Sequence, residues 1–235
     1  VIPKDFGASQ DGYIDTDIYT DRLEKFQFRE WNNPDLYMDE NIRRMLSNYR
    51  FNFMALAKQY QKDGQVDSAR YWLKWGEEKI PFRASETNTS LKLLYSVRYA
   101  QVGLEEDAFR LANSSKSGLV EMLNKNLNRF SNIEAEFNSL NQELETAKAR
   151  GDIRTQREIR PQLQKLNNDA QQYLTEVRTA RQSLVLVQYA YFQSGNTEEA
   201  QALATEVNAA MGSSFPPMPD TKEASEQEIS RYGLN

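Results

Sequence analysis

The most regular apolar pattern in this chain repeats every three or four residues, which is the period of one helix face. It consists of Leu119, Leu123, Leu127, Phe130, Ile133, Phe137, Leu140 and Leu144. A turn signal at residues 150–152 follows, and a second stripe returns through Leu163, Leu166, Tyr173 and Val177. We therefore predict a long antiparallel helical hairpin over about residues 119–180, with arms of roughly 45 Å at ~1.5 Å per residue. We also expect the two stripes to seal against each other.

The returning arm contains a proline, Pro161. Proline either kinks a helix from inside or occupies its first turn, where its missing N–H is not needed. The sequence allows both positions. Residues 150–152 spell Arg-Gly-Asp, and we interpret them as the turn that such a hairpin needs rather than as a recognition motif.

A second pattern occurs three times around this hairpin: a tyrosine, a glycine four residues later and an alanine five residues after the glycine. The copies are Tyr60, Gly64 and Ala69; Tyr99, Gly103 and Ala108; and Tyr191, Gly195 and Ala200. This spacing is typical of tetratricopeptide-type repeats, in which a large residue ends helix A, glycine makes the turn, and a small residue lets helix B pack closely. We predict repeats at about residues 50–81, 89–115 and 181–211.

The remaining segments complete an all-α prediction. Residues 1–13 resemble an extended linker, a short helical pattern covers residues 15–28, and a longer helix is expected over about residues 39–63. Residues 114–118, Ser-Ser-Lys-Ser-Gly, predict a break after the second repeat. The proline-rich and polar residues 212–235 predict a disordered tail. The expected fold is thus one all-α domain over residues 14–211, with tetratricopeptide-like helical hairpins and a long antiparallel helical-hairpin insertion.

Composition excludes several kinds of chemistry. The chain has 29 Lys and Arg against 34 Asp and Glu, a net charge of −5, so it has no general attraction to nucleic acid. It contains no Cys and no His, which excludes thiol nucleophiles, imidazole bases and Cys/His zinc sites. No apolar run reaches the roughly 18–20 residues of a membrane helix. We expect no cofactor, no metal and no membrane insertion by this segment.

The remaining candidates for acid–base chemistry are acidic clusters. Residues 105–107 and 198–199 directly follow repeat turns, where carboxylates stabilise the start of a helix. We favour this interpretation over a catalytic dyad, and we expect Glu77 and Glu78 to face solvent. A carboxylate-based hydrolase is therefore the weakest functional alternative, and we predict that this chain is not an enzyme.

Repeats of this kind bind peptides along a face lined by their A helices. The corresponding positions here are Lys58, Lys62, Gln101, Tyr189 and Gln193. Lys58 and Lys62 lie one helical turn apart and would attract a carboxylate of an acidic or polar peptide. The alternative is an ordinary solvated helix face with extended lysine side chains.

One segment carries a family resemblance. Residues 33–50, NPDLYMDENIRRMLSNYR, resemble the soluble C-terminal part of a bacterial family of multi-pass membrane proteins of unknown function. The membrane half of that family is similar to polyprenyl-sugar-dependent protein O-mannosyltransferases. The similarity extends over about residues 11–210. It implies a parent enzyme whose catalytic carboxylates lie in membrane loops outside this chain, so no catalytic residue is carried over.

The resemblance leads to a functional expectation with one alternative. We expect a non-catalytic domain, tethered to the inner membrane on its periplasmic side, that engages an acceptor protein or a partner subunit. We also expect the chain to be a soluble piece of a longer protein. The alternative is a free-standing tetratricopeptide-type adaptor in the cytoplasm that binds a peptide or protein. Membrane helices encoded upstream of Val1 would distinguish the two.

Overall fold

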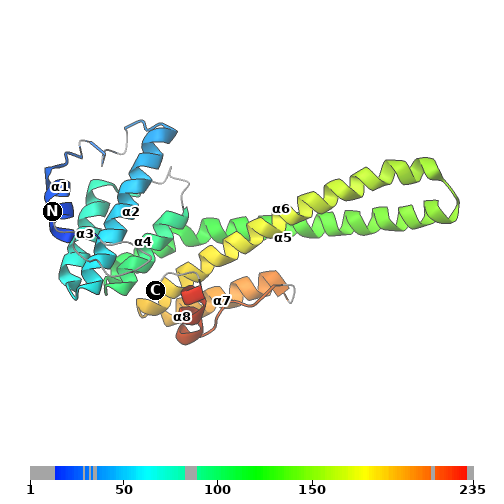
Figure 1. The fold of residues 1–235 in the computed structure, drawn as a ribbon. Coiled ribbons are helices and arrows are strands. Elements are labelled where there is room, and N and C mark those ends of the chain that lie inside the picture. Colours follow the sequence, from blue (N-terminus) through cyan, green and yellow to red (C-terminus); the bar gives the residue numbers. More distant parts are fainter. Residues whose placement is uncertain are drawn as a thin grey trace, which may run out of the picture. The chain divides into compact units, whose positions relative to one another are not determined.

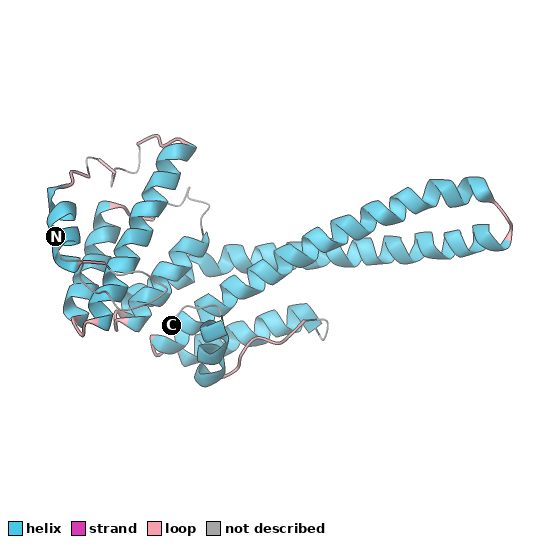
Figure 2. Cartoon of the chain, viewed as in Figure 1, coloured by secondary structure: helices cyan, strands magenta, loops and turns pink. Residues whose placement is uncertain are grey.

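A computed structural model describes residues 14–28, 30–31, 33, 36–82, 89–212 and 215–231. The described residues are helical or in loops and include no strand, so the predicted all-α class is confirmed for them (Figures 1 and 2). The helices are α1 (Thr16–Lys25), α2 (Glu40–Lys62), α3 (Val66–Lys79), α4 (Thr89–Gln101), α5 (Glu105–Ala149), α6 (Ile153–Gln193), α7 (Thr197–Met211) and α8 (Lys222–Arg231). The predicted linker at residues 1–13 lies outside the described residues.

The chain divides into two compact units, Val1–Leu111 and Ala112–Asn235, where we expected a single domain over residues 14–211. In the first unit, α2 packs against α3 and α4. In the second, α6 packs against α7 and α8 and runs antiparallel to the long arm of α5 (Figure 1).

The same turn joins α2 to α3, α4 to α5 and α6 to α7. Its glycine has a left-handed φ of 75° at Gly64, 74° at Gly103 and 76° at Gly195, a conformation that other residues adopt only with strain. In every copy the residue after the glycine donates its backbone N–H to the carbonyl of the repeat tyrosine, at 2.8–2.9 Å. The small residue of helix B is fully buried in each copy: Ala69, Ala108 and Ala200. The predicted turn and close-packing positions are therefore confirmed.

The core of the first unit is rich in aromatic side chains. A Cβ built at Gly76 of α3 would lie 2.5 Å from the Phe53 ring of α2 and 2.8 Å from the Tyr95 hydroxyl of α4. These two side chains therefore approach Gly76 too closely for any side chain at that position. Next to this contact, Trp75 packs edge-on against Phe28 and Phe53. Phe53 belongs to the hydrophobic core of this unit, and the partly buried rings of Phe28 and Trp75 pack against that core.

The predicted hairpin is present as the two arms of α5 and α6, and both arms extend beyond residues 119–180. At its tip, Gly151 has a φ of 70°. The Asp152 carboxylate accepts hydrogen bonds from the Thr155 backbone N–H (3.1 Å) and hydroxyl (2.7 Å), and these bonds hold its pKa below the ordinary value. Asp152 is therefore the N-cap of α6, in agreement with the interpretation of residues 150–152 as a turn. Pro161 lies well inside α6, so a first-turn position is wrong.

The predicted break at residues 114–118 is wrong, because α5 continues through it without interruption. Serine and glycine cost a helix only about 0.5–1 kcal/mol each, and tertiary contacts outweigh that cost here. Ser115 is buried, and the neighbouring Asn113 accepts a hydrogen bond from the Tyr191 hydroxyl of α6 at 2.8 Å.

The predicted disorder of the tail is wrong for residues 215–231. They form a short extended segment and then α8, which packs on α6. The segment is anchored by the buried side chains of Met218 and Ile229. Asn208 accepts a hydrogen bond from the Met218 backbone N–H at 2.7 Å, and Gln188 donates to the Pro219 carbonyl at 2.5 Å. The tail is polar on average, so its composition alone does not reveal these few anchoring residues.

Candidate functional site

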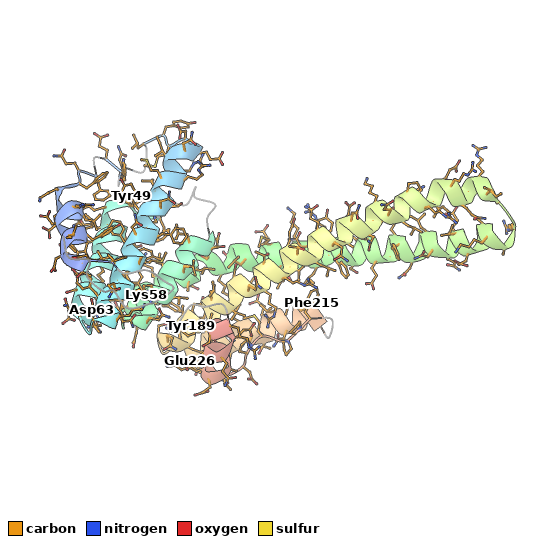
Figure 3. All side chains as sticks on the ribbon, in the orientation of Figure 1. Tyr49, Lys58, Asp63, Tyr189, Phe215 and Glu226 are labelled. Atoms are coloured by element: carbon orange, nitrogen blue, oxygen red, sulfur yellow. The ribbon has the colours of Figure 1, made fainter. Side chains whose placement is uncertain are left out.

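The three predicted binding residues of the first unit lie on α2 and α4. Lys58 is half-buried on α2 (Figure 3). Lys62, one turn later on the same helix, is exposed. Gln101 is half-buried at the end of α4, and its backbone carbonyl accepts a hydrogen bond from the Gln61 side chain at 3.0 Å. The structure thus brings the end of α2 next to Gln101.

The two predicted binding residues of the second unit do not line an open groove. Tyr189 is 8% exposed. Gln193 donates a hydrogen bond to the Glu226 carboxylate of α8 at 2.6 Å. Helix α8 therefore contacts this part of α6, where we had expected a partner to bind.

Two buried arginines hold the segments that follow helices α3 and α7. Arg50 is 1% exposed, donates to the Ile80 and Pro81 carbonyls at 3.2 and 2.7 Å, and stacks on Phe82 with its guanidinium 4.3 Å from the ring centre. Arg181 donates to the carbonyls of Pro216 (2.9 Å) and Pro217 (2.7 Å) and to the carboxylate of Glu228 (2.7 Å).

These arginines occupy equivalent positions, ten residues before the repeat tyrosines Tyr60 and Tyr191. The equal offset was a signal in the sequence that we did not use. Because their donors bind carbonyls and a carboxylate of the same chain, the two guanidinium groups have a structural role.

Several of the acidic residues named as candidates are engaged in ion pairs or stand at helix starts. The expectation that Glu77 faces solvent is wrong: its side chain is 16% exposed and accepts hydrogen bonds from the Tyr99 hydroxyl (2.7 Å) and from Arg110 (2.8 Å). Burial, followed by the neighbouring Tyr95 and then by the negative charge of Glu77, raises the pKa of Tyr99. Asp107, in the first turn of α5, pairs with Lys74 at 3.0 Å. These carboxylates join α3, α4 and α5.

Two features are absent from the residues that the structure describes. No group of three or more Asp and Glu side chains there is placed to hold a metal ion. None of the helices in that part of the chain combines the length and apolar character needed to cross a membrane.

A hollow lies in the second unit, along one face of the α5–α6 hairpin. A cavity of about 560 Å³ and one of about 210 Å³ share Phe130, Glu134 and Leu174 and therefore adjoin each other. We call the two together the hairpin groove. It is lined by Phe130, Ile133, Glu134, Phe137, Leu166, Asn167, Ala170, Gln171, Leu174, Arg178, Arg181, Gln182, Phe215 and Pro216.

The neighbouring face of the same hairpin is polar. It carries a depression of about 400 Å³ that shares only Ile133 and Leu166 with the hairpin groove. Its other lining residues are Arg129, Asn132, Glu136, Gln162, Lys165, Asp169 and Tyr173. The hairpin thus has one face with apolar side chains and one with charged and amide side chains.

The expectation that the two apolar stripes seal against each other is wrong for the middle of the hairpin. Phe130, Ile133, Phe137 and Leu174 are only half-buried there. The apolar stripe of such a helix covers more than a quarter of its circumference, and one neighbouring helix can cover only part of it. The remaining apolar surface lines the hairpin groove.

No protein-family model, curated protein or solved structure matches this chain. The hairpin groove is the candidate functional site on the strength of its own geometry and chemistry.

Proposed function

We propose that this chain is a non-catalytic protein-interaction domain whose binding face is the hairpin groove. The observation that carries the proposal is the half-buried apolar surface of Phe130, Phe137 and Leu174 on one side of the hairpin, beside a polar side. Contiguous apolar surface that a protein leaves accessible typically marks an interaction site. Aromatic side chains in a groove are the residues that supply most binding energy in protein interfaces.

The architecture agrees with this role. We interpret the three equivalent hairpins as tetratricopeptide-like repeats, with the long α5–α6 hairpin as an insertion between the second and third. The support is their common spacing, glycine conformation and buried alanine. Repeats of this type build binding surfaces.

We further propose that the domain belongs to a membrane glycosyltransferase-like protein, on the extracytoplasmic side, where it engages an acceptor protein or a partner subunit. The support is the resemblance of residues 33–50 described above. A free-standing adaptor in the cytoplasm is the alternative. A gene that encodes several membrane helices directly before Val1 supports the first proposal, and a gene without them supports the second.

Photo-crosslinking in the source cell tests the binding face. A photoreactive amino acid replaces Phe130 or Phe137 in the hairpin groove, or Glu136 or Lys165 on the polar face as matched controls. We expect protein adducts from positions 130 and 137 and few from positions 136 and 165. Equal yields from both faces, or none from either, would contradict the proposal.

A further inference from the structure

We propose that the hairpin groove binds one amphipathic helix of a partner protein, which lies along the two arms as a third helix beside them. The proposal rests on the hairpin groove being the binding face and names the kind of partner that it takes. It follows from what covers the same face of the hairpin nearer its base, and from the spacing and charges of the groove residues.

At the base of the hairpin, a helix of this chain already lies beside both arms. There α7 packs on α6 (Figure 1), and the Gln188 side chain of α6 donates a hydrogen bond to the Ala200 carbonyl of α7 at 3.2 Å. On the other arm, Lys116 of α5 pairs with Glu206 of α7 at 3.5 Å. Helix α7 is therefore the third helix beside this part of the hairpin.

Helical periodicity places the groove on the face that α7 covers. Ala170 lies 18 residues before Gln188 on α6, and Glu134 lies 18 residues after Lys116 on α5. Because an α-helix has about 3.6 residues per turn, 18 residues correspond to about five full turns, and the two residues of each pair point to nearly the same side. Ala170 and Glu134 both line the hairpin groove. The groove therefore continues, toward the tip, the face that α7 covers at the base.

The groove has the length of a helix of four to five turns. Phe215 and Pro216, which follow α7 in the chain, line its base end together with Gln182, and Leu166 lines its tip end. From Leu166 to Gln182 the groove follows 16 residues of α6, which is roughly 24 Å at ~1.5 Å per residue. A partner helix of about 16 residues fills this length.

The apolar residues of the groove have the spacing of a helix-packing surface. Phe130, Ile133 and Phe137 follow each other on α5 at intervals of three and four residues, and Ala170 and Leu174 lie four residues apart on α6. All five are half-buried. Rows with these intervals form the ridges between which the side chains of another helix insert. The partner helix should therefore carry its apolar residues at intervals of three and four as well.

A helix suits this surface better than an extended strand does. An extended peptide binds mainly through its backbone hydrogen bonds to an exposed sheet edge. The backbone groups inside α5 and α6 are instead bonded within each helix, so the arms offer few backbone partners. A bound helix satisfies its own backbone groups and needs only the side-chain contacts that the groove provides.

Two charged residues predict the charges of the partner helix. Glu134 of α5 and Arg178 of α6 are exposed and line the groove. The Arg129 guanidinium lies 5.4 Å from the centre of the Tyr173 ring, and in this register Glu134 lies level with about residue 169. Arg178 is then nine residues farther along, roughly 13 Å at ~1.5 Å per residue. The partner helix should place a Lys or Arg beside Glu134 and, about nine residues away, an Asp or Glu beside Arg178.

The charge beside α5 distinguishes this partner from α7. At the base, the α5 residue on this face is basic, Lys116, and the third helix supplies the acidic Glu206. Five turns farther out the α5 residue is Glu134, so an acidic residue at the same place would be repelled. The groove thus favours a helix with the opposite charge at this position.

Mapped photo-crosslinks measure the conformation of the bound segment. A photoreactive amino acid is placed in the full chain at position 130, 137 or 182, and mass spectrometry identifies the partner residue that each position reaches. Positions 137 and 182 lie roughly 24 Å apart along the groove, which is about 16 residues of a helix but only about 7 of an extended strand. We expect the partner residues reached from these two positions to lie about 16 residues apart, with the one reached from position 130 between them.

A synthetic peptide of the crosslinked segment then tests the charges by fluorescence anisotropy with the full chain. Glu134→Arg should raise the Kd of this peptide roughly 10-fold, because it places like charges together. A change of the facing basic peptide residue to glutamate should have the same effect, and the two changes together should recover most of the affinity. Glu136→Arg on the polar face is the matched control and should leave the Kd unchanged. Circular dichroism confirms that each variant is folded.

The outcomes separate this inference from the proposed function. Partner residues about seven positions apart, or two charge changes that do not compensate each other, would overturn the helical partner and leave the binding face standing. Crosslinks that map to a second copy of this chain would do the same. No adducts from positions 130 and 137 would refute the binding face and this inference with it.

Discussion

Buried arginines and tyrosines make the decisive polar contacts of this chain. Arg50 and Arg181 each donate hydrogen bonds to two backbone carbonyls, in the segments that follow α3 and α7 respectively. The Arg181 ion pair with Glu228 is mostly buried, with side-chain exposures of 10% and 16%. Removal of one partner from such a pair leaves the other charge and its acceptors without compensation.

Arg181→Met should therefore lower the free energy of unfolding by about 3 kcal/mol, in the range for a broken buried pair. The control is Arg160→Met on the same helix, where the arginine is exposed and the change should stay within about 0.5 kcal/mol. Urea denaturation measures both. Equal effects of the two substitutions would show that the Arg181 contacts contribute little.

The buried alanines of the three repeats carry a second prediction. Ala69, Ala108 and Ala200 are fully buried where the hairpin helices cross, so a leucine at any of them overpacks the crossing by about 1–3 kcal/mol. Ala55→Leu on the exposed side of α2 is the control. Thermal melts should show a lower midpoint for the three buried variants and not for the control. Unchanged midpoints in all three would refute the repeat interpretation.

Buried tyrosines predict a loss of stability at high pH. Burial, with a smaller contribution from Glu199, raises the pKa of Tyr191 to about 12, and burial also raises the pKa of Tyr99 and Tyr95. In the unfolded chain tyrosine ionises near pH 10. The unfolded state therefore loses protons first, and the stabilisation that is complete below about pH 10 is lost as the pH rises toward and beyond 12.

Urea denaturation between pH 8 and pH 11 checks this sign. The free energy of unfolding should fall with each step above about pH 10, and Tyr191→Phe should make the fall less steep. A stability that is constant or rising over this range would contradict the assignment of these tyrosines as buried and protonated.

Helices were predictable where a local pattern and the tertiary contacts agree. The carboxylate of Asp39 caps α2 through the Ile42 backbone N–H at 2.9 Å, near the start that the sequence indicates. The break at residues 114–118 and the disorder of residues 215–231 were wrong, because both predictions used local composition alone. Contacts from α6 hold both segments, and a window of neighbouring residues contains no information about them.

Helix α8 should open as a single unit when its ion pair with Arg181 is weakened. Glu228→Gln weakens its contact with Arg181, so the amides of α8 should exchange with deuterium several-fold faster, while those of α2 and α3 stay unchanged. Glu223→Gln, at an exposed position of α8, is the control. Exchange that accelerates equally everywhere would indicate global destabilisation instead of local opening.

At the scale of the whole molecule, the sequence predicted the hairpin but not its groove. The apolar periodicity of α5 and α6 identifies which residues face the other arm. It does not tell which edge of each stripe that arm covers, since this depends on the rotation of both helices about their axes. Gln193 was assigned to an open face from the repeat pattern, which contains no information about α8, and α8 lies there.

The interaction role predicts that the isolated domain has no glycosyl transferase or glycosidase activity. Glu77, Asp107 and Glu228 are engaged by Tyr99, Arg110, Lys74 and Arg181. Assays with glycosyl donors and glycosides should give no turnover above buffer. Turnover that one Asp- or Glu-to-Ala substitution abolishes would refute the non-catalytic role.

The most direct measurement of the central claim is hydroxyl-radical footprinting of the protein in its native assembly, isolated without dissociation. If a partner covers the hairpin groove, Phe130, Phe137 and Leu174 should react several-fold more slowly in the assembly than in the purified chain alone. Tyr173 on the polar face should react equally in both. Equal reactivity of the groove residues in the two samples, or protection that is confined to Tyr173, would contradict the claim that this groove is the binding face.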